Sequence, residues 1–155
     1  MEALVTAIML WLSANFDLPA QSEQPQIKIV SATEIVAQRY GAISPEKRRE
    51  VLALAKNAAS ANKGREVVAI YDDTSKTIML PEGWTGSTPA ELSVLVHELV
   101  HHLQRVSDLK YECPGAREAL AYSAQDKWLG LFGLSLSKEF DIDAFTLKVS
   151  TTCGF

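Results

Sequence analysis

The chain has 155 residues, of which 47% are hydrophobic and 22% charged, and its formal net charge is −4. This composition is typical of a globular protein with a sizeable core, and we expect one domain over residues 1–155. The acidic balance and the lack of a basic stripe argue against nucleic acid as a partner. The two cysteines are too few for a disulfide framework.

The N-terminal stretch Ala3–Leu12 is apolar enough to raise the question of a signal segment. However, Glu2 stands where a signal carries a positive charge, Leu18-Pro19-Ala20 is a poor cleavage site, and the stretch is too short to cross a bilayer. We therefore expect no transmembrane segment, and we slightly favour a soluble cytoplasmic protein over a periplasmic or secreted one. A core helix over about Glu2–Asn15 is expected instead, with an apolar face of Leu4, Ile8, Trp11 and Leu12.

Capping residues divide the next part of the chain into short elements. A polar linker over Asp17–Pro25 precedes a short strand at Gln26–Val30. Ser31-Ala32-Thr33-Glu34 has the spacing of a capping box and predicts a short helix. Ser44-Pro45-Glu46 opens a third helix, which Asn62–Gly64 closes.

The clearest β structure lies in the middle of the chain. Glu66–Tyr71 and Thr77–Leu80 are rich in residues that favour strands, and Asp72–Lys76 between them has the composition of a turn. The pattern predicts a hairpin with a longer loop.

A helix with well-marked ends follows this hairpin. Thr88, Pro89 and Glu91 have the spacing of an N-cap, a first helical residue and the acidic third residue of a capping box. An apolar stripe continues at helical spacing through Leu92, Leu95, Val96, Leu99, Leu103 and Val106. The stripe predicts one core-facing side for this helix, and His97 and His101 lie off it.

The motif on this helix is His-Glu-x-x-His, at His97, Glu98 and His101. Two residues four apart lie on the same face of a helix, so both imidazoles can bind one ion. Glu98 lies about 100° around the helix, where it flanks the ion and can take a proton from a metal-activated water. A second register pairs Glu98 with His102, but it leaves the other two histidines without a role.

A loop over Ser107–Gly115 and a helix over Ala116–Leu129 come next, and Gly130 breaks that helix. In the mixed tail, Phe145–Val149 has the composition of an extended segment. The elements together predict a mainly helical α+β fold, with a small antiparallel β-hairpin or sheet beside the His-Glu helix and a glutamate-bearing helix after it.

A catalytic zinc site usually has three protein ligands, so the two histidines need a third residue. Glu118 is favoured because it lies near the start of the next helix, where the small Ala119 and Ala121 would let two helices approach closely. The alternative for Glu118 is an acidic residue that only stabilises a helix N-terminus. The candidates considered are Asp108, Glu112, Cys113, Glu118 and Asp126.

His97-Glu98-x-x-His101 followed by a helical Glu118 resembles the gluzincin metallopeptidases, which have a zincin-like fold. The residues from Tyr111 to Leu129 are also similar to a bacterial family of this type. The resemblance covers roughly Val67 to Leu129. It implies Zn²⁺ bound by His97, His101 and Glu118, with Glu98 as the general base. It further implies that Thr77–Leu80 is an edge strand against which an extended peptide could pair.

Tyr122 departs from the gluzincin pattern, because many gluzincins carry an aspartate at this position that holds a zinc-binding histidine. A tyrosine hydroxyl accepts a weaker hydrogen bond from an imidazole N–H than a carboxylate does, which would lower the affinity of the site for its metal. Tyr122 and His102 are also candidates for stabilising an oxyanion. For both, a simpler interpretation competes: packing for Tyr122, and a surface position beside Glu98 for His102.

The sequence therefore predicts a zinc metallopeptidase that hydrolyses peptide bonds through a metal-activated water, with Glu98 as the base and a peptide or protein as the substrate. The alternative is a zinc-binding regulatory or binding module, or a latent zincin without physiological turnover.

Cys113 and Cys153 are the two cysteines of the chain. A disulfide between them, which would close a loop of roughly 40 residues, is favoured over two packed free thiols. A third possibility is that the Cys113 thiolate binds zinc in place of the water.

Overall fold

The structure is a computed structural model that describes residues 1–40, 44–47, 49–50, 53 and 69–154. The chain divides into two compact units, which we call the helical unit (Met1–Pro25 and Gly86–Phe155) and the sheet unit (Gln26–Thr85). The predicted mainly helical α+β class is confirmed. The interior and end of the predicted third helix, and the first residues of the strand predicted at Glu66–Tyr71, lie outside the described residues.

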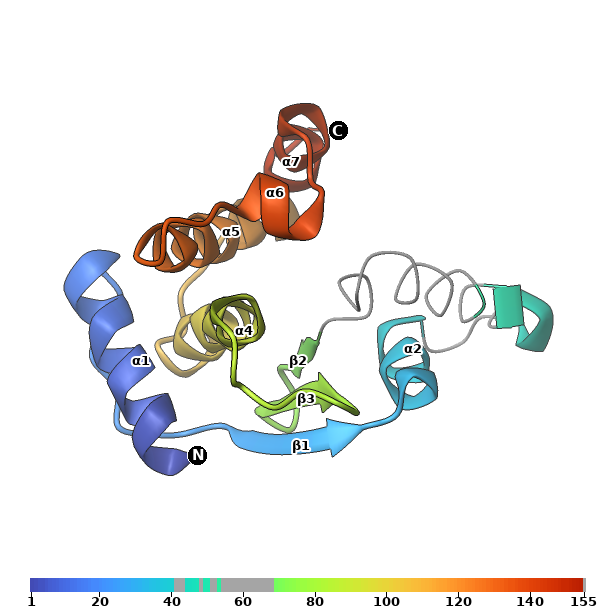
Figure 1. The fold of residues 1–155 in the computed structure, drawn as a ribbon, viewed down its shortest axis with the longest axis horizontal. Coiled ribbons are helices and arrows are strands. Elements are labelled where there is room, and N and C mark those ends of the chain that lie inside the picture. Colours follow the sequence, from blue (N-terminus) through green and yellow to red (C-terminus); the bar gives the residue numbers. More distant parts are fainter. Residues whose placement is uncertain (41–43, 48, 51–52, 54–68, 155) are drawn as a thin grey trace. The chain divides into compact units, whose positions relative to one another are not determined.

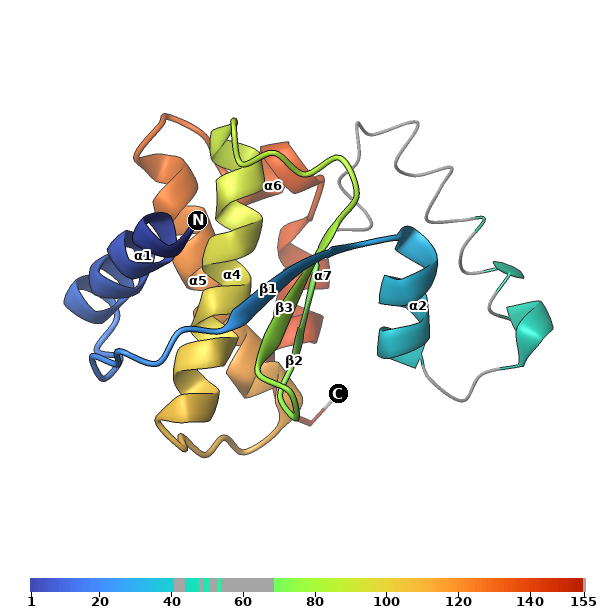
Figure 2. The ribbon, with the colours of Figure 1, turned by 90° about the horizontal axis from the view of Figure 1, so that it is seen from below.

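The helical unit contains five helices in the described part of the chain, and α4 lies at its centre. Helix α4 packs against both α5 and α1, while α5 also packs against α6 and α7 (Figures 1 and 2). Their bounds are α1 (Glu2–Asn15), α4 (Pro89–Val106), α5 (Pro114–Gly130), α6 (Leu136–Phe140) and α7 (Ala144–Thr151).

Helix α1 starts and ends where the sequence predicted, and it is a core helix. Its buried face consists of Val5, Ile8, Met9 and Leu12. Leu4 and Trp11 of the predicted face are half-buried, because the buried face is turned slightly toward Val5 and Met9. No helix in the described ranges is long and apolar enough to cross a membrane.

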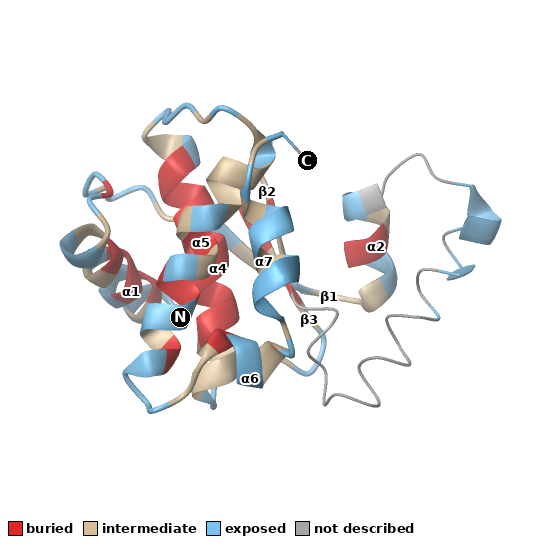
Figure 3. Cartoon of the chain, turned by 90° about the horizontal axis from the view of Figure 1, so that it is seen from above, coloured by how far each residue is buried: buried red, intermediate tan, exposed pale blue. Residues whose placement is uncertain are grey.

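Helix α4 begins with the predicted cap. The Thr88 hydroxyl accepts a hydrogen bond from the Glu91 backbone N–H at 3.1 Å, and Pro89 is the first helical residue. The Glu91 carboxylate accepts from the Ser87 N–H at 3.0 Å. Every residue from Ser93 to Gln104 is buried (Figure 3), so the predicted single stripe is too narrow. The reason is that neighbouring helices cover more than one side of α4, which also buries its polar residues.

The sheet unit contains β1 (Gln26–Val30), β2 (Ile70–Asp72) and β3 (Thr77–Pro81), in the order β1-β3-β2. The predicted hairpin is confirmed, because β2 pairs antiparallel with β3. The implied edge strand at Thr77–Leu80 is wrong: β3 is the central strand, since β1 pairs with it in parallel, with Gln26 opposite Thr77.

A capping box links β1 to α2 (Ala32–Tyr40) within the same unit. The Ser31 N–H donates to the Glu34 carboxylate at 3.0 Å, and the Glu34 N–H donates to the Ser31 hydroxyl at 3.2 Å. The reciprocal pair is the one that the sequence pattern predicted, and it satisfies two N–H groups at the helix start.

The tail differs from its prediction, because Phe145–Val149 lies inside α7 and is helical. Asp143 caps this helix: its carboxylate accepts from the Thr146 N–H at 2.7 Å and from the Thr146 hydroxyl at 3.1 Å. This cap outweighs the strand preference of phenylalanine, threonine and valine. Helix α5 also starts earlier than predicted, at Pro114, since proline suits the first helical position.

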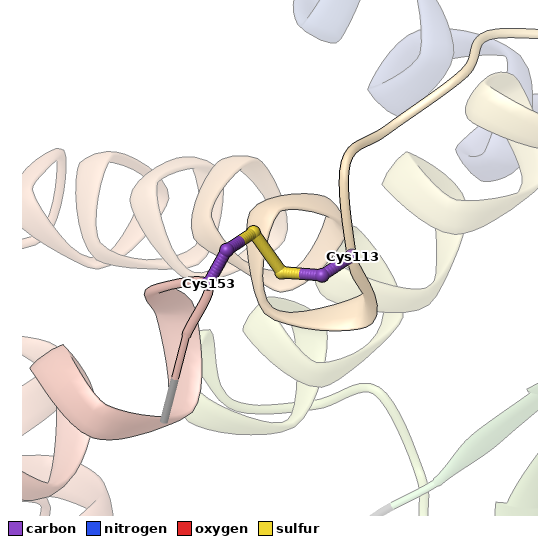
Figure 4. Close-up of a disulfide and its surroundings, with 2 residues drawn as sticks. All are labelled: Cys113 and Cys153. Carbon is purple, nitrogen blue, oxygen red and sulfur yellow. A yellow bond between two sulfur atoms is a disulfide. The ribbon is translucent and has the colours of Figure 1, made fainter.

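A disulfide joins Cys113, just before α5, to Cys153, just after α7 (Figure 4), with their Cα atoms 5.8 Å apart. The favoured pairing is therefore present, and a Cys113 thiolate ligand to zinc is excluded because its sulfur is already bonded. For a sequence separation of 40 residues, the chain-entropy model gives a stabilisation of about 4 kcal/mol.

The start of α5 approaches the end of α7 so closely that a side chain at Gly115 would be crowded. A Cβ atom there would lie 3.1 Å from the Thr152 carbonyl oxygen and 3.3 Å from that of Ser150. These are backbone atoms beside the disulfide, so they cannot easily move aside.

We expect Gly115→Ala to lower the free energy of unfolding, by about 1–3 kcal/mol, because overpacking outweighs the gain in helix propensity. Gly130→Ala is the matched control at the other end of α5, where a Cβ meets nothing within 4 Å. It should be neutral or stabilising by up to about 1 kcal/mol. Urea unfolding of both variants provides the comparison, and equal stabilities would contradict the close approach.

Candidate metal centre

His97, His101 and Glu118 converge where α4 packs against α5. The two Glu118 carboxylate oxygens lie 3.0 Å from His97 Nε2 and 3.1 Å from His101 Nε2. The two imidazoles come from successive turns of α4, and their ring centroids are 5.0 Å apart. One donor atom from each residue lies within 4.8 Å of the others, so the structure brings together all three residues that the sequence predicted as ligands.

Small residues on α5 account for this approach. Ala121 and Ala124 are fully buried on the helix that carries Glu118, so the α5 backbone can come close to its neighbours. Ala119, which the sequence also favoured for this role, is exposed. The interface therefore follows the spacing Ala121–Ala124, three residues apart on one face of the helix.

The other nitrogen of each imidazole faces a glutamine. His97 Nδ1 lies 3.0 Å from the Gln125 side-chain oxygen, and His101 Nδ1 lies 2.9 Å from that of Gln104. Gln104 and Gln125 are 2% and 4% exposed. Metal-binding histidines in proteins almost always have such a partner on the nitrogen that does not bind the metal.

Sequence reasoning did not assign a role to these two glutamines. A signal was present, because Gln104 lies seven residues after His97 and Gln125 seven after Glu118, each on the same helix face as the ligand. An uncharged amide at a core position usually needs a buried partner.

Tyr122, which stands four residues after Glu118, contacts His97 through its ring. The two ring centroids are 4.7 Å apart at an interplanar angle of 72°. This contact is the packing role that the simpler interpretation gave to Tyr122, and the residue at His97 Nδ1 is Gln125.

His102 is fully buried, so the interpretation as a surface residue is wrong. Its Nε2 lies 2.7 Å from the Glu23 carbonyl oxygen, because the linker after α1 folds back onto α4 within the helical unit. The N–H that could have stabilised an oxyanion is thus used to hold this linker.

Glu98 is 6% exposed, although it carries a carboxylate. Among the described residues, none forms a hydrogen bond with this carboxylate. Its negative charge does act on His101, whose pKa it helps to raise. The described residues hold one fully buried side-chain polar atom without a hydrogen-bond partner, Trp128 Nε1, so the Glu98 carboxylate keeps some contact with solvent.

The charges of the group are strongly coupled. Burial alone would raise the pKa of Glu118, but the hydrogen bonds and charges of His101 and His97 hold it well below its usual range. Burial lowers the pKa of His101, but the hydrogen bond with Glu118 and the charges of Glu98 and Glu118 outweigh it, and the pKa is raised. The group thus favours a positive charge between the two rings and the carboxylate.

Two imidazole nitrogens and a carboxylate oxygen are a donor set that zinc accepts. One donor atom from each of the three residues lies within 4.8 Å of the other two, so a single ion could be bound by all three after small side-chain adjustments. The Glu118 side chain is 36% exposed, whereas the two histidines are nearly enclosed, so the centre can be reached from the glutamate side.

The other ligand candidates lie outside this group. Asp108 is exposed and pairs with Lys110 at 2.7 Å, and Glu112 is also exposed. Asp126 accepts a hydrogen bond from the Leu136 N–H at 2.9 Å, and Cys113 is in the disulfide. Of the described residues, only His97, His101 and Glu118 form a group that could hold a metal ion.

A model of one protein family, described as Domain of unknown function (DUF6647), matches residues 1–154. No curated protein and no solved structure matches the chain.

Proposed function

We propose that this chain, which belongs to the DUF6647 family, is a zinc-dependent metallopeptidase of gluzincin type. The observation that carries the proposal is the convergence of His97, His101 and Glu118 beside a buried Glu98. Three protein ligands with one side open to solvent are typical of a catalytic zinc site, whereas structural zinc sites have four.

When bound, zinc supplies a Lewis acid that acidifies a water molecule and polarises a peptide carbonyl. His97, His101 and Glu118 would hold the ion. Glu98 would accept the proton of the attacking water and pass it to the leaving amine. Its carboxylate suits this role because no hydrogen bond with a described residue has to be broken first.

An oxidising compartment fits this chain better than the cytoplasm, which the sequence of the N-terminal stretch slightly favoured. The Cys113–Cys153 disulfide supports this part of the proposal, because such bonds rarely persist in the cytoplasm. The substrate would be a peptide or protein.

We expect Glu118→Ala to weaken zinc binding by orders of magnitude, because two protein ligands seldom hold the ion tightly. Glu112→Ala is the matched control, since Glu112 is also a glutamate, is exposed and lies just before α5, outside the group of three. Competition with a chromophoric chelator measures both affinities. Equal affinities for the two variants, or tighter binding by Glu118→Ala, would contradict the assignment.

We expect Glu98→Gln to keep its zinc and to lose peptide hydrolysis, because the amide cannot accept the proton. Metal content by elemental analysis and cleavage of a peptide library provide the two readouts. The unsubstituted protein could bind zinc and yet cleave no peptide, or Glu98→Gln could cleave peptides equally well. Either result would assign the centre to the alternative class, a zinc-binding module without turnover.

A further inference from the structure

We infer that the adjacent ends of α1 and α5 form a docking surface for a bilayer of zwitterionic lipid. This surface, which we call the aromatic patch, lies in the helical unit and combines exposed leucines with four aromatic rings. Its members are Leu10, Trp11, Phe16, Trp128, Leu131 and Phe132. The inference does not depend on the proposed function, because the patch shares no residue with the metal centre.

Ring contacts join the four aromatic residues of the patch into one group. The Trp11 ring centroid lies 5.7 Å from that of Phe16 and 5.4 Å from that of Trp128. The Trp128 centroid in turn lies 5.8 Å from that of Phe132. The Trp11–Trp128 contact is edge-to-face, at 86°, which is a favourable arrangement for two aromatic rings. It holds the end of α1 beside the end of α5.

The aromatic patch is apolar and yet open to solvent. Leu10 is 62% exposed, Leu131 60% and Phe132 50%, and the other three members are half-buried. These exposed side chains are not needed for the core, because α1 packs on α4 through the buried face described above. Apolar groups that gather on a surface in this way indicate an interaction site.

The two stretches of chain that form the patch carry no charge. No Asp, Glu, Lys or Arg occurs in residues 3–16 or 128–137, although 22% of the whole chain is charged. The charged residues next to these stretches are Asp17, Asp126 and Lys127. An anionic lipid surface would repel the two aspartates and the net charge of −4, whereas a zwitterionic surface has no net charge to oppose them.

Lys127 lies at the edge of the patch and is exposed. Its Nζ is 5.4 Å from the ring centroid of Phe16. At a lipid surface, tryptophan and phenylalanine rings lie at the level of the headgroups, and a lysine beside them can reach the lipid phosphate. The composition of the patch and of its edge therefore matches a zwitterionic headgroup layer.

The size of the patch disfavours a second copy of the chain as its partner. If about half of each exposed side chain is accessible, Leu10, Leu131 and Phe132 present roughly 300 Å² of apolar surface. A stable dimer buries about 800 Å² on each partner. Binding to a bilayer has no such threshold, because its strength rises with the apolar area that is inserted.

Trp128 has a property that suits a lipid interface. Its Nε1 is fully buried and has no hydrogen-bond partner among the described residues. The ring can therefore turn without breaking a hydrogen bond. The phosphate and ester oxygens of a lipid would offer this N–H the acceptor that it lacks, as they do for tryptophans at membrane surfaces.

The test is the partition of the purified, disulfide-bonded chain onto phosphatidylcholine vesicles, measured by co-sedimentation without added metal. We expect binding that does not increase when phosphatidylglycerol is included, because the chain is acidic. Trp84→Phe leaves Trp11 and Trp128 as the tryptophans of the chain. The emission of this variant should therefore shift to shorter wavelength on binding.

The double variant Leu131→Ser, Phe132→Ser should lower the partition coefficient about 10-fold or more, because two apolar side chains no longer enter the bilayer. Phe145→Ser is the matched control, since Phe145 is 75% exposed but lies on α7, outside the patch. It should bind like the unsubstituted chain. If circular dichroism shows that the double variant is unfolded, Leu10→Ser on the other helix decides instead.

Three results would overturn the inference: no binding of the unsubstituted chain to phosphatidylcholine, binding that requires the anionic lipid, or an equal loss of binding in Phe145→Ser. A dimer in light scattering that the double variant dissociates would assign the patch to a second copy and overturn the lipid assignment. Because no metal is added, a failure of the metallopeptidase proposal would leave these outcomes unchanged.

Discussion

The close packing of α5 against α4 is the contact on which the rest of the helical unit depends. It requires residues as small as Ala121 and Ala124 on α5, and both are fully buried. The same contact places Glu118 within hydrogen-bond distance of His97 and His101. A larger side chain at either alanine would push α5 away from α4. It would thus disturb the core of the unit and the spacing of the three donor atoms at the same time.

The packing also explains how α4 tolerates so many buried polar side chains. His97, His101 and Gln104 of α4 are all nearly inaccessible, and each has a hydrogen-bond partner within the α4–α5 pair. Buried polar groups are stable only when such partners are present. Trp128 Nε1 is the exception, as the one fully buried side-chain polar atom of the described residues that has no hydrogen-bond partner.

The features that the sequence predicted best are those that local interactions determine. Thr88 and Ser31 are caps that act within four residues, so the starts of α4 and α2 could be placed from the pattern alone. The spacing of His97 and His101 follows from helix geometry, so their common face was also predictable. The prediction of Glu118 as a ligand required one further assumption, namely that consecutive helices pack side by side.

What the sequence did not predict depends on partners far along the chain. The central place of β3 results from parallel pairing with β1, about fifty residues earlier, which no local pattern indicates. His102 is buried because a linker 79 residues away in sequence returns to it. The glutamine partners of the histidines come from two different helices, so the periodicity of one helix could not identify both.

The disulfide has a consequence for how the chain behaves when it is cut. Helix α7 follows an exposed turn in which Asp141 has a left-handed backbone, and such turns are preferred by proteases. Because Cys153 is bonded to Cys113, a cut there would leave the C-terminal piece covalently attached just before α5, with four helical residues between Cys113 and Glu118. The nicked protein would remain one molecule until it met a reductant, and the loss of its tail would therefore report on the redox state of its surroundings.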